Sequence, residues 1–293
     1  MKIAIIGAGN VGAMTASRII DTDLADVILV DVVPGMAKGK ALDISDTRPI
    51  SGSSVNIQGS EDIKDIKNSG IVVITAGLAR KPGMSRDDLL KKNSEIVKAL
   101  SSQIKKYCPN AIMIVVTNPL DVMSYLAMKT TDFDPKKVIG MAGVLDSARF
   151  INAVSEKNKG FYGEEVFMMG SHGDTMVPIN RSKLSEDAFK RSSEIARNRG
   201  AEIVKYLGTG SAYFAPSMSV FYMVEAIIKD RKKTVCASAY LDGQYGEKDI
   251  YIGVPVVLGS SGAEKVVEIK LTEDEKTAFQ KSAQDIRELI SKI

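Results

Sequence analysis

The chain holds one histidine, His172, which lies in the run Gly-Ser-His-Gly-Asp-Thr-Met-Val-Pro. Histidine has an unperturbed pKa close to neutral pH, so proton transfer at that pH points first to this residue. Glycine and serine flank it and indicate a short, turn-like loop, the kind of segment that often carries functional residues. The alternative is an imidazole that is merely solvated or buried in the core.

Three arginines and one aspartate lie near expected strand or helix ends. Arg80 and Arg86 belong to the long connection after the apolar run 71–75, whose glycines and proline predict a lid over a ligand. Asp146 and Arg149 are three residues apart in a helical pattern and would share one helix face. A surface ion pair is the alternative explanation for these two residues.

A glycine-rich segment near the N-terminus has the spacing of a dinucleotide-binding turn. Gly7, Gly9 and Gly12 follow an apolar run and open a helical pattern. They would form the tight turn, admit a pyrophosphate and let helix and strand pack closely, with the helix N-terminus facing the anion. Asp31 closes the next strand, where a carboxylate binds both ribose hydroxyls and repels a 2′-phosphate. The pattern therefore favours NAD over NADP.

Strand and helix patterns alternate through the first half of the chain. Strands are expected at residues 2–6, 27–30, 55–57, 71–75, 112–116 and 138–141, and helices at 10–20, 36–44 and 86–107. Ser85 and Asp88 provide a capping box for the last of these helices. This alternation predicts an α/β fold with a Rossmann-type doubly wound parallel sheet.

The second half has a different pattern, typical of a mixed α+β domain. Helices are expected at 145–158 and 184–206, strands at 234–240, 250–257 and 266–270, and a last helix after the capping box of Thr272 and Glu275. We therefore expect an NAD-binding domain at 1–141 and a catalytic or substrate domain at 142–293, packed tightly because no Pro/Gly-rich linker separates them.

Composition narrows the class of protein. A net charge of +3, from 39 basic and 36 acidic residues, argues against a nucleic-acid surface. The two cysteines, Cys108 and Cys236, lack metal-like spacing and are expected to be reduced, buried thiols, with no metal site. Glycines and charges interrupt the apolar N-terminus, so neither a signal peptide nor a membrane helix is expected.

Six motifs, in this order, together resemble the lactate/malate dehydrogenase family over the whole chain. They are Gly7-Ala-Gly-Asn-Val-Gly12, Thr75-Ala-Gly77, Arg80-Lys-Pro-Gly-Met-Ser-Arg86, Val116-Thr-Asn-Pro119, Leu145-Asp-Ser-Ala-Arg149 and His172-Gly-Asp-Thr175. The chain is most similar to the lactate-dehydrogenase-like malate dehydrogenases. Ala79 and Ser171 depart from the Pro and Gly that many malate enzymes have there, and neither change removes a reacting side chain.

The resemblance implies a role for each polar residue. His172 would be the acid/base, Asp146 would orient and charge its ring, and Arg149 would bind the substrate carboxylate in a two-pronged fork. Arg86 would polarise the reacting carbonyl. Asn118 would hydrogen-bond the substrate, next to a Pro119 bond that is cis in relatives. The implied cofactor-binding residues are Gly7, Ala8, Gly9, Asn10, Val11, Gly12, Asp31, Thr75, Ala76, Gly77, Asn93, Val116, Thr117 and Asn118.

The resemblance implies that the position of Arg80 selects between the family's substrates. Lactate enzymes have Gln at this position, whereas an arginine can pair with the second carboxylate of malate or oxaloacetate. Ala212 stands where lactate enzymes tend to have Thr and leaves room for the larger acid. The resemblance thus implies an NAD-dependent malate dehydrogenase of the tricarboxylic acid cycle, cytoplasmic and a homotetramer or homodimer, without nucleic-acid or membrane partners.

Three other functions stay open at this point. A lactate or other 2-hydroxyacid dehydrogenase is disfavoured by Arg80. An NAD-using glycosidase would need cysteine and histidine metal ligands, and neither cysteine lies near His172 in the sequence. A non-catalytic NADH sensor would need neither the His-Asp pair nor the arginine lid. Comparing NADH oxidation with oxaloacetate and with pyruvate separates these possibilities.

Overall fold

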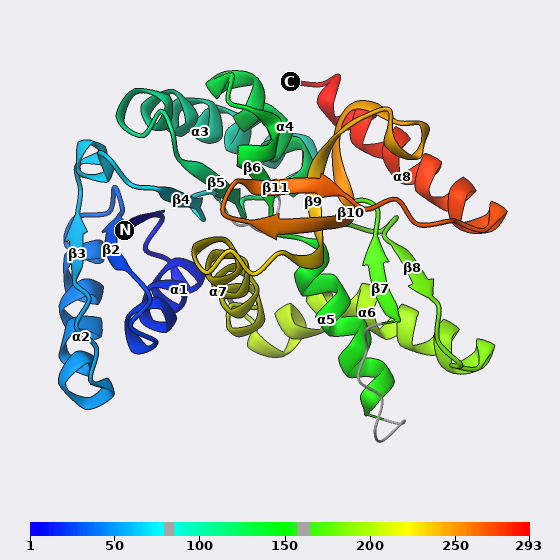
Figure 1. The fold of residues 1–293 in the computed structure, drawn as a ribbon, viewed down its shortest axis with the longest axis horizontal. Coiled ribbons are helices and arrows are strands. Elements are labelled where there is room, and N and C mark those ends of the chain that lie inside the picture. Colours follow the sequence, from blue (N-terminus) through cyan, green and yellow to red (C-terminus); the bar gives the residue numbers. More distant parts are fainter. Residues whose placement is uncertain (79–84, 157–164) are drawn as a thin grey trace.

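A nine-stranded sheet runs through the centre of the molecule in the computed structural model, which describes residues 1–78, 85–156 and 165–293 (Figure 1). Six neighbouring strands are parallel and lie in the order β3-β2-β1-β4-β5-β6. This order confirms the Rossmann-type doubly wound sheet. The six strands are β1 (Lys2–Ile6), β2 (Asp26–Val30), β3 (Ile57–Ser60), β4 (Ile71–Ile74), β5 (Ile112–Val115) and β6 (Val138–Gly140).

Three antiparallel strands from the second half extend the same sheet. β6 pairs with β9 (Lys233–Asp242) at Gly140 and Ser238, and β10 (Lys248–Gly259) and β11 (Gly262–Val266) follow outward. A separate two-stranded sheet consists of β7 (Val166–Met169) and β8 (Val177–Asn180). The second half is therefore a mixed α+β arrangement, as expected.

Helices cover both faces of the central sheet (Figure 1), which explains why inner parallel strands such as β4 and β5 are apolar along their whole length. One face carries α1 (Asn10–Asp21), α2 (Met36–Ser51) and α7 (Phe214–Ile228), and the other carries α3 (Arg86–Tyr107), α4 (Leu120–Thr131) and α8 (Glu273–Ile290). Short 3-10 helices lie at Ile63–Ile66, Pro135–Lys137 and Gln244–Gly246.

A second, smaller apolar core lies beside the main one. It joins α5 (Gly143–Ser155), α6 (Glu186–Leu207) and β7 through Phe150, Val166, Met168 and Ala196. Phe150 and Phe189 meet edge-on there, with ring centroids 5.8 Å apart. This body carries α5 and the loop after β7, which are the two segments with the expected acid/base residues.

Some elements differ from the expected ones. The strand expected at 266–270 is wrong: β11 ends at Val266, because a two-residue turn at 260–261 starts it early at Gly262. β3 begins where the expected strand 55–57 ends, and α2 continues past residue 44 to Ser51 with Pro49 inside it. Besides the three 3-10 helices, two α-helices and two strands of the described residues were not expected, namely α4, α7, β7 and β8.

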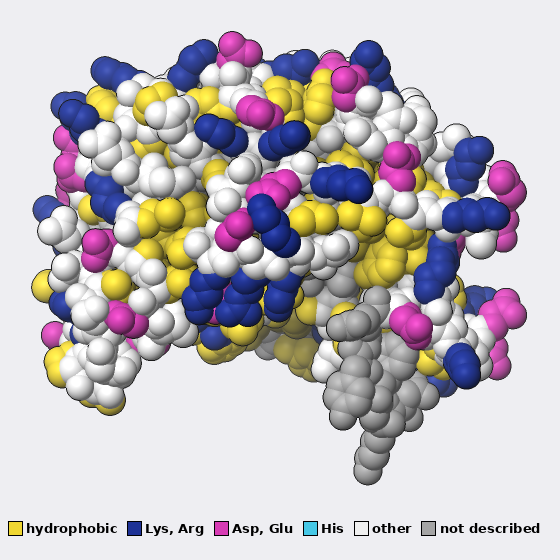
Figure 2. Space-filling view, viewed as in Figure 1, with side chains coloured by type: hydrophobic (Ala, Val, Ile, Leu, Met, Phe, Trp, Pro, Cys, Tyr) yellow, Lys and Arg dark blue, Asp and Glu magenta, His cyan; other side chains and the backbone are white. Residues whose placement is uncertain are grey.

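The surface and the thiols agree with the composition. Lys and Arg side chains lie among Asp and Glu side chains over the face shown in Figure 2. Cys108 and Cys236 are both buried and free, and burial raises the pKa of Cys236 to about 12. Within the three described ranges, no helix combines the length and the apolar character needed to cross a membrane.

Candidate active site

The loop that carries His172 is fixed at its start by a glycine. Gly170 follows β7 with a φ of +82°, a conformation that favours glycine, and exchanges two backbone hydrogen bonds with Gly253 of β10. The next amide, Ser171 N–H, donates to Ser282 Oγ of α8 at 2.7 Å. The backbone before His172 is consequently held in place, and the His172 side chain has 18% of its surface exposed.

His172 and Asp146 form a buried hydrogen-bonded pair. The His172 Nδ1 to Asp146 Oδ2 distance is 2.7 Å, and the carboxylate is only 3% exposed. A carboxylate only accepts hydrogen bonds, so Nδ1 donates and Nε2 is left to exchange a proton with a substrate. Burial lowers the pKa of His172, but the charge and hydrogen bond of Asp146, together with the charge of Asp121, outweigh that effect and the net shift is upward.

Arg149 lies one turn further along α5, against the same carboxylate. Its Nη1 is 3.6 Å from Asp146 Oδ1, and its side chain is 13% exposed. Across α6, a Cβ on Gly200 would lie 3.6 Å from Arg149 Nη1, so the guanidinium packs against that helix. The pair is thus buried rather than a surface ion pair, and it joins His172 in one cluster.

Of the two arginines expected in the lid, only Arg86 lies within the described residues, and Arg80 lies outside them. Arg86 is the first residue of α3, and its Nη2 is 3.2 Å from Asp174 Oδ2, two residues after His172. Both side chains are more than three-quarters exposed, so this ion pair stabilises little and leaves Arg86 able to turn to a substrate.

Asn93 ties together the segments that follow β4 and β5. Its Oδ1 accepts from Leu78 N–H at 2.8 Å, and its Nδ2 donates to the Asn118 carbonyl at 2.7 Å. The Asn118–Pro119 peptide is cis, as the resemblance implied. Thr117 Oγ1 donates to the Ala76 carbonyl at 2.7 Å. The expected cofactor residues of these two segments therefore meet at the carboxyl ends of neighbouring strands.

The glycine-rich turn has the geometry that an anionic dinucleotide needs. A Cβ on Gly12 would overlap the Gly7 carbonyl oxygen, whereas a Cβ on Gly9 would meet nothing within 4 Å. Gly9 precedes α1, whose N-terminus has no side-chain cap, so its N–H groups can serve a pyrophosphate. Asp31 Oδ2 accepts from Ala8 N–H at 2.6 Å and Oδ1 from Val33 N–H at 2.9 Å, which fixes its carboxylate beside the turn.

Both halves of the chain match one family. Residues 1–140 match the profile of the lactate/malate dehydrogenase, NAD binding domain, and residues 143–293 match that of the lactate/malate dehydrogenase, alpha/beta C-terminal domain. The chain belongs to the lactate/malate dehydrogenase family. Its cofactor is accordingly NAD, and it is an NAD-dependent oxidoreductase.

Full-length relatives and solved structures support the same family assignment. The chain is 47% identical to the malate dehydrogenase of Methanosarcina mazei, covering 100% of this chain and 99% of the relative. The malate dehydrogenase structure from Salinibacter ruber has a TM-score of 0.93 at 41% identity, covering 100% and 97%. The Cryptosporidium parvum lactate dehydrogenase complexed with lactic acid and NAD also has a TM-score of 0.93, at 36% identity, covering 99% and 96%.

Two residues near the family's site were not expected from the sequence. Lys40 of α2 donates to the Ala8 carbonyl at 2.7 Å, so the glycine-rich turn is held from both sides. Asp121 of α4 accepts from the backbone N–H of His172 at 2.8 Å. Asp121 lies within an apolar run, two residues after Pro119, and only its charge there could have drawn notice.

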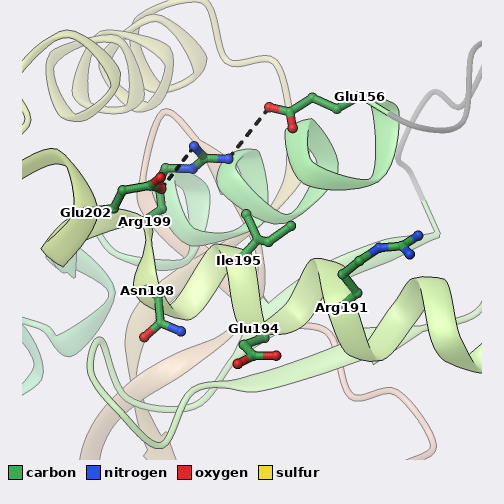
Figure 3. A pocket seen from close by; sticks show the side chains of 7 residues that line it. All are labelled: Glu156, Arg191, Glu194, Ile195, Asn198, Arg199 and Glu202. Atoms are coloured by element: carbon green, nitrogen blue, oxygen red, sulfur yellow. Dashed lines mark hydrogen bonds and ion pairs between the residues drawn. The ribbon is translucent and has the colours of Figure 1, made fainter.

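A hollow of about 470 Å³ between α5 and α6 is not this site (Figure 3). Arg199 spans it with ion pairs to Glu156 and Glu202. Its lining is mostly charged and includes none of the family's candidate residues. The lining residues are Glu156, Arg191, Glu194, Ile195, Asn198, Arg199 and Glu202.

Proposed function

We propose that the chain is an NAD-dependent malate dehydrogenase, which transfers hydride reversibly between malate and NAD and gives oxaloacetate and NADH. The observation that carries the proposal is the buried cluster of His172, Asp146 and Arg149 within a fold of this family. In this proposal His172 is the acid/base and the guanidinium of Arg149 binds a carboxylate, which are the two groups that reduction of a 2-keto acid requires.

In the direction of oxaloacetate reduction, His172 donates the proton from Nε2 to the keto oxygen. When bound, NADH supplies the hydride. Asp146 stabilises the imidazolium before the transfer and fixes which nitrogen carries the reacting proton. Arg149 binds the substrate carboxylate, Arg86 polarises the carbonyl, and Asn118 hydrogen-bonds the substrate.

The cofactor occupies residues 1–141 in this proposal, and residues 142–293 contribute the acid/base and Arg149. The open space at Gly9 and the uncapped α1 support pyrophosphate binding. Asp31, already held by Ala8 N–H, would accept from the ribose hydroxyls and repel a 2′-phosphate. The other cofactor-binding residues proposed above would line the same strand ends.

The choice of malate rests on Arg80 and on the malate dehydrogenases among the relatives. An arginine in a closed site gains a charge-assisted pair with oxaloacetate, whereas pyruvate leaves it unpaired. Ala212, between α6 and α7, adds room for the second carboxylate. A lactate-type enzyme would instead prefer pyruvate.

The experiment that tests this proposal compares kcat/KM for oxaloacetate and for pyruvate with NADH. The wild type should prefer oxaloacetate by about 10⁴-fold, as sites built around a polar partner do. Arg80→Gln should collapse oxaloacetate activity and raise pyruvate activity in relative terms. A wild type that prefers pyruvate would establish the lactate alternative, and an unchanged ratio in Arg80→Gln would remove Arg80 as the selector.

We also propose a cytoplasmic homotetramer or homodimer that serves the tricarboxylic acid cycle. Large apolar side chains are exposed on α6 and α7, and contact with a second copy would bury them. They are Val204, Tyr206, Leu207, Phe214 and Met218. Sedimentation equilibrium measures the assembly, and a monomer at micromolar concentration would contradict it.

A further inference from the structure

A second buried carboxylate, Asp121, lies behind the His172 loop. It belongs to the first turn of α4 and is 4% exposed. Its Oδ2 accepts from His172 N–H at 2.8 Å, and its Oδ1 accepts from Ser238 Oγ on β9 at 2.6 Å. Asp121 therefore joins three segments at the place where β9 meets the parallel strands.

Burying an ionised carboxylate at this position is energetically unfavourable. Burial raises the pKa of Asp121, and the hydrogen bonds from Ser238 and from His172 N–H offset part of that effect. No arginine or lysine of the described ranges forms an ion pair with it. An asparagine could satisfy the same two partners without the cost of a buried charge, so bonding alone does not account for an acid here.

We propose that Asp121 is a positioning residue that holds the His172 backbone and, as a second carboxylate, stabilises the imidazolium form for proton donation. This inference rests on the acid/base role of His172 proposed above. The two acids contact different parts of His172. Asp146 accepts a hydrogen bond from the ring at Nδ1, whereas Asp121 accepts one from the backbone N–H and stabilises the charged ring electrostatically, without contacting it.

The charges around His172 are consistent with this role. Asp146 and Asp121 favour the charged ring, and Arg149 of α5 opposes it. On the loop itself, Asp174 is paired with Arg86 and exposed to solvent, so water screens it. Of the other contacts of the loop, Gly253 on β10 and Ser282 on α8 carry no charge. Arg197 of α6 donates to the Met176 carbonyl at 3.1 Å, four residues after His172. The second acid thus offsets the nearby guanidinium of Arg149.

The test uses the fact that His172 is the only histidine. A protein whose histidine is isotopically labelled gives one imidazole signal. An NMR titration of that signal reports the pKa of His172 and does not depend on enzyme activity. Asp121→Asn keeps the shape: its oxygen can accept from His172 N–H and its amide can donate to Ser238 Oγ. We expect the His172 pKa to fall by about 0.5 to 1 unit in this variant.

The kinetic readout should follow the titration. Above the wild-type inflection, kcat/KM for oxaloacetate should fall about three- to tenfold in Asp121→Asn, because one unit is tenfold in the protonated fraction. Below the variant's inflection it should match the wild type. Ser238→Ala removes a hydrogen bond that stabilises the ionised carboxylate of Asp121, so it should also lower the His172 pKa, by less than Asp121→Asn does. This variant replaces Asp121→Asn in the test if Asp121→Asn does not fold.

Ser282→Ala is the matched control, since it removes an uncharged anchor of the same loop and should leave the His172 pKa unmoved. The inference is overturned if Asp121→Asn, or in its place Ser238→Ala, titrates like the wild type, or if Ser282→Ala shifts the pKa equally. A wild type that does not reduce oxaloacetate refutes the proposed function instead, and the NMR result separates the two failures.

Discussion

Replacing Asp146 by asparagine removes the negative charge that faces Nδ1 of His172 and leaves the shape of the side chain almost unchanged. The wild-type atoms are 2.7 Å apart and Asp146 is 3% exposed, so solvent screens the pair weakly. Unit charges about 4 Å apart attract by about 4 kcal/mol at an effective dielectric constant of about 20. Arg149, at 3.6 Å from Oδ1, shares the carboxylate. We therefore expect a loss of about 2–3 kcal/mol, or about 10²-fold in kcat/KM for oxaloacetate.

The assay is NADH oxidation as a function of pH, with the NADH dissociation constant measured separately by fluorescence. The inflection assigned to His172 should move to lower pH, because the remaining amide no longer favours the imidazolium. Ser147→Ala is a control in the same helical turn, where Ser147 Oγ accepts from Met168 N–H at 3.0 Å. It should lower stability by about 1 kcal/mol and leave kcat/KM unchanged. An Asp146→Asn enzyme within about twofold of the wild type would refute the reasoning.

Three further predictions concern the cofactor, the substrate and stability. Wild type should prefer NADH over NADPH by about 1–3 kcal/mol in kcat/KM, and Asp31→Ser should narrow the gap mainly by harming NADH; equal use by the wild type would contradict this. Arg149→Lys should raise KM for oxaloacetate about 10-fold or more without changing NADH affinity, since an ammonium cannot form the two-pronged contact. Folding raises the pKa of His172, so the protonated imidazole contributes to the free energy of unfolding. This contribution should be full below about pH 6.5 and lost as pH rises through the pKa of the folded state. Urea unfolding of wild type and His172→Gln measures this, and a wild-type advantage that grows with pH would show the sign to be wrong.

Sequence reasoning located elements that have a strong local signal. The apolar runs of β1, β4 and β5 marked buried parallel strands, and the capping boxes at Ser85 and Thr272 marked the starts of α3 and α8. Each of these signals lies within a few neighbouring residues, so it can be recognised without knowledge of the packing.

The missed elements lack such a signal. α4 is buried on most of its surface, so its apolar residues show little helical periodicity. α7 is also largely apolar, and Pro216 lies in its first turn. β7 and β8 have four residues each and depend on pairing with one another. These elements are determined by tertiary packing, which a short stretch of sequence does not reveal.

The site shows the same division. Motifs identified His172, Asp146 and Arg149, but the 2.7 Å contact between His172 and Asp146 joins residues 26 positions apart and follows only from the fold. Asp121 was missed although its charge interrupts an apolar run, because its contacts follow only from the fold. Its partners are a backbone amide and Ser238, which is 117 positions away.

The central claim is that His172 is the acid/base of oxaloacetate reduction, and wild type and His172→Asn test it side by side. NADH oxidation with oxaloacetate gives turnover, and NADH fluorescence gives the dissociation constant of the same preparations. We expect His172→Asn to bind NADH within about twofold of the wild type and to lose turnover by on the order of 10²–10⁴-fold. Near-wild-type turnover in His172→Asn would contradict the claim.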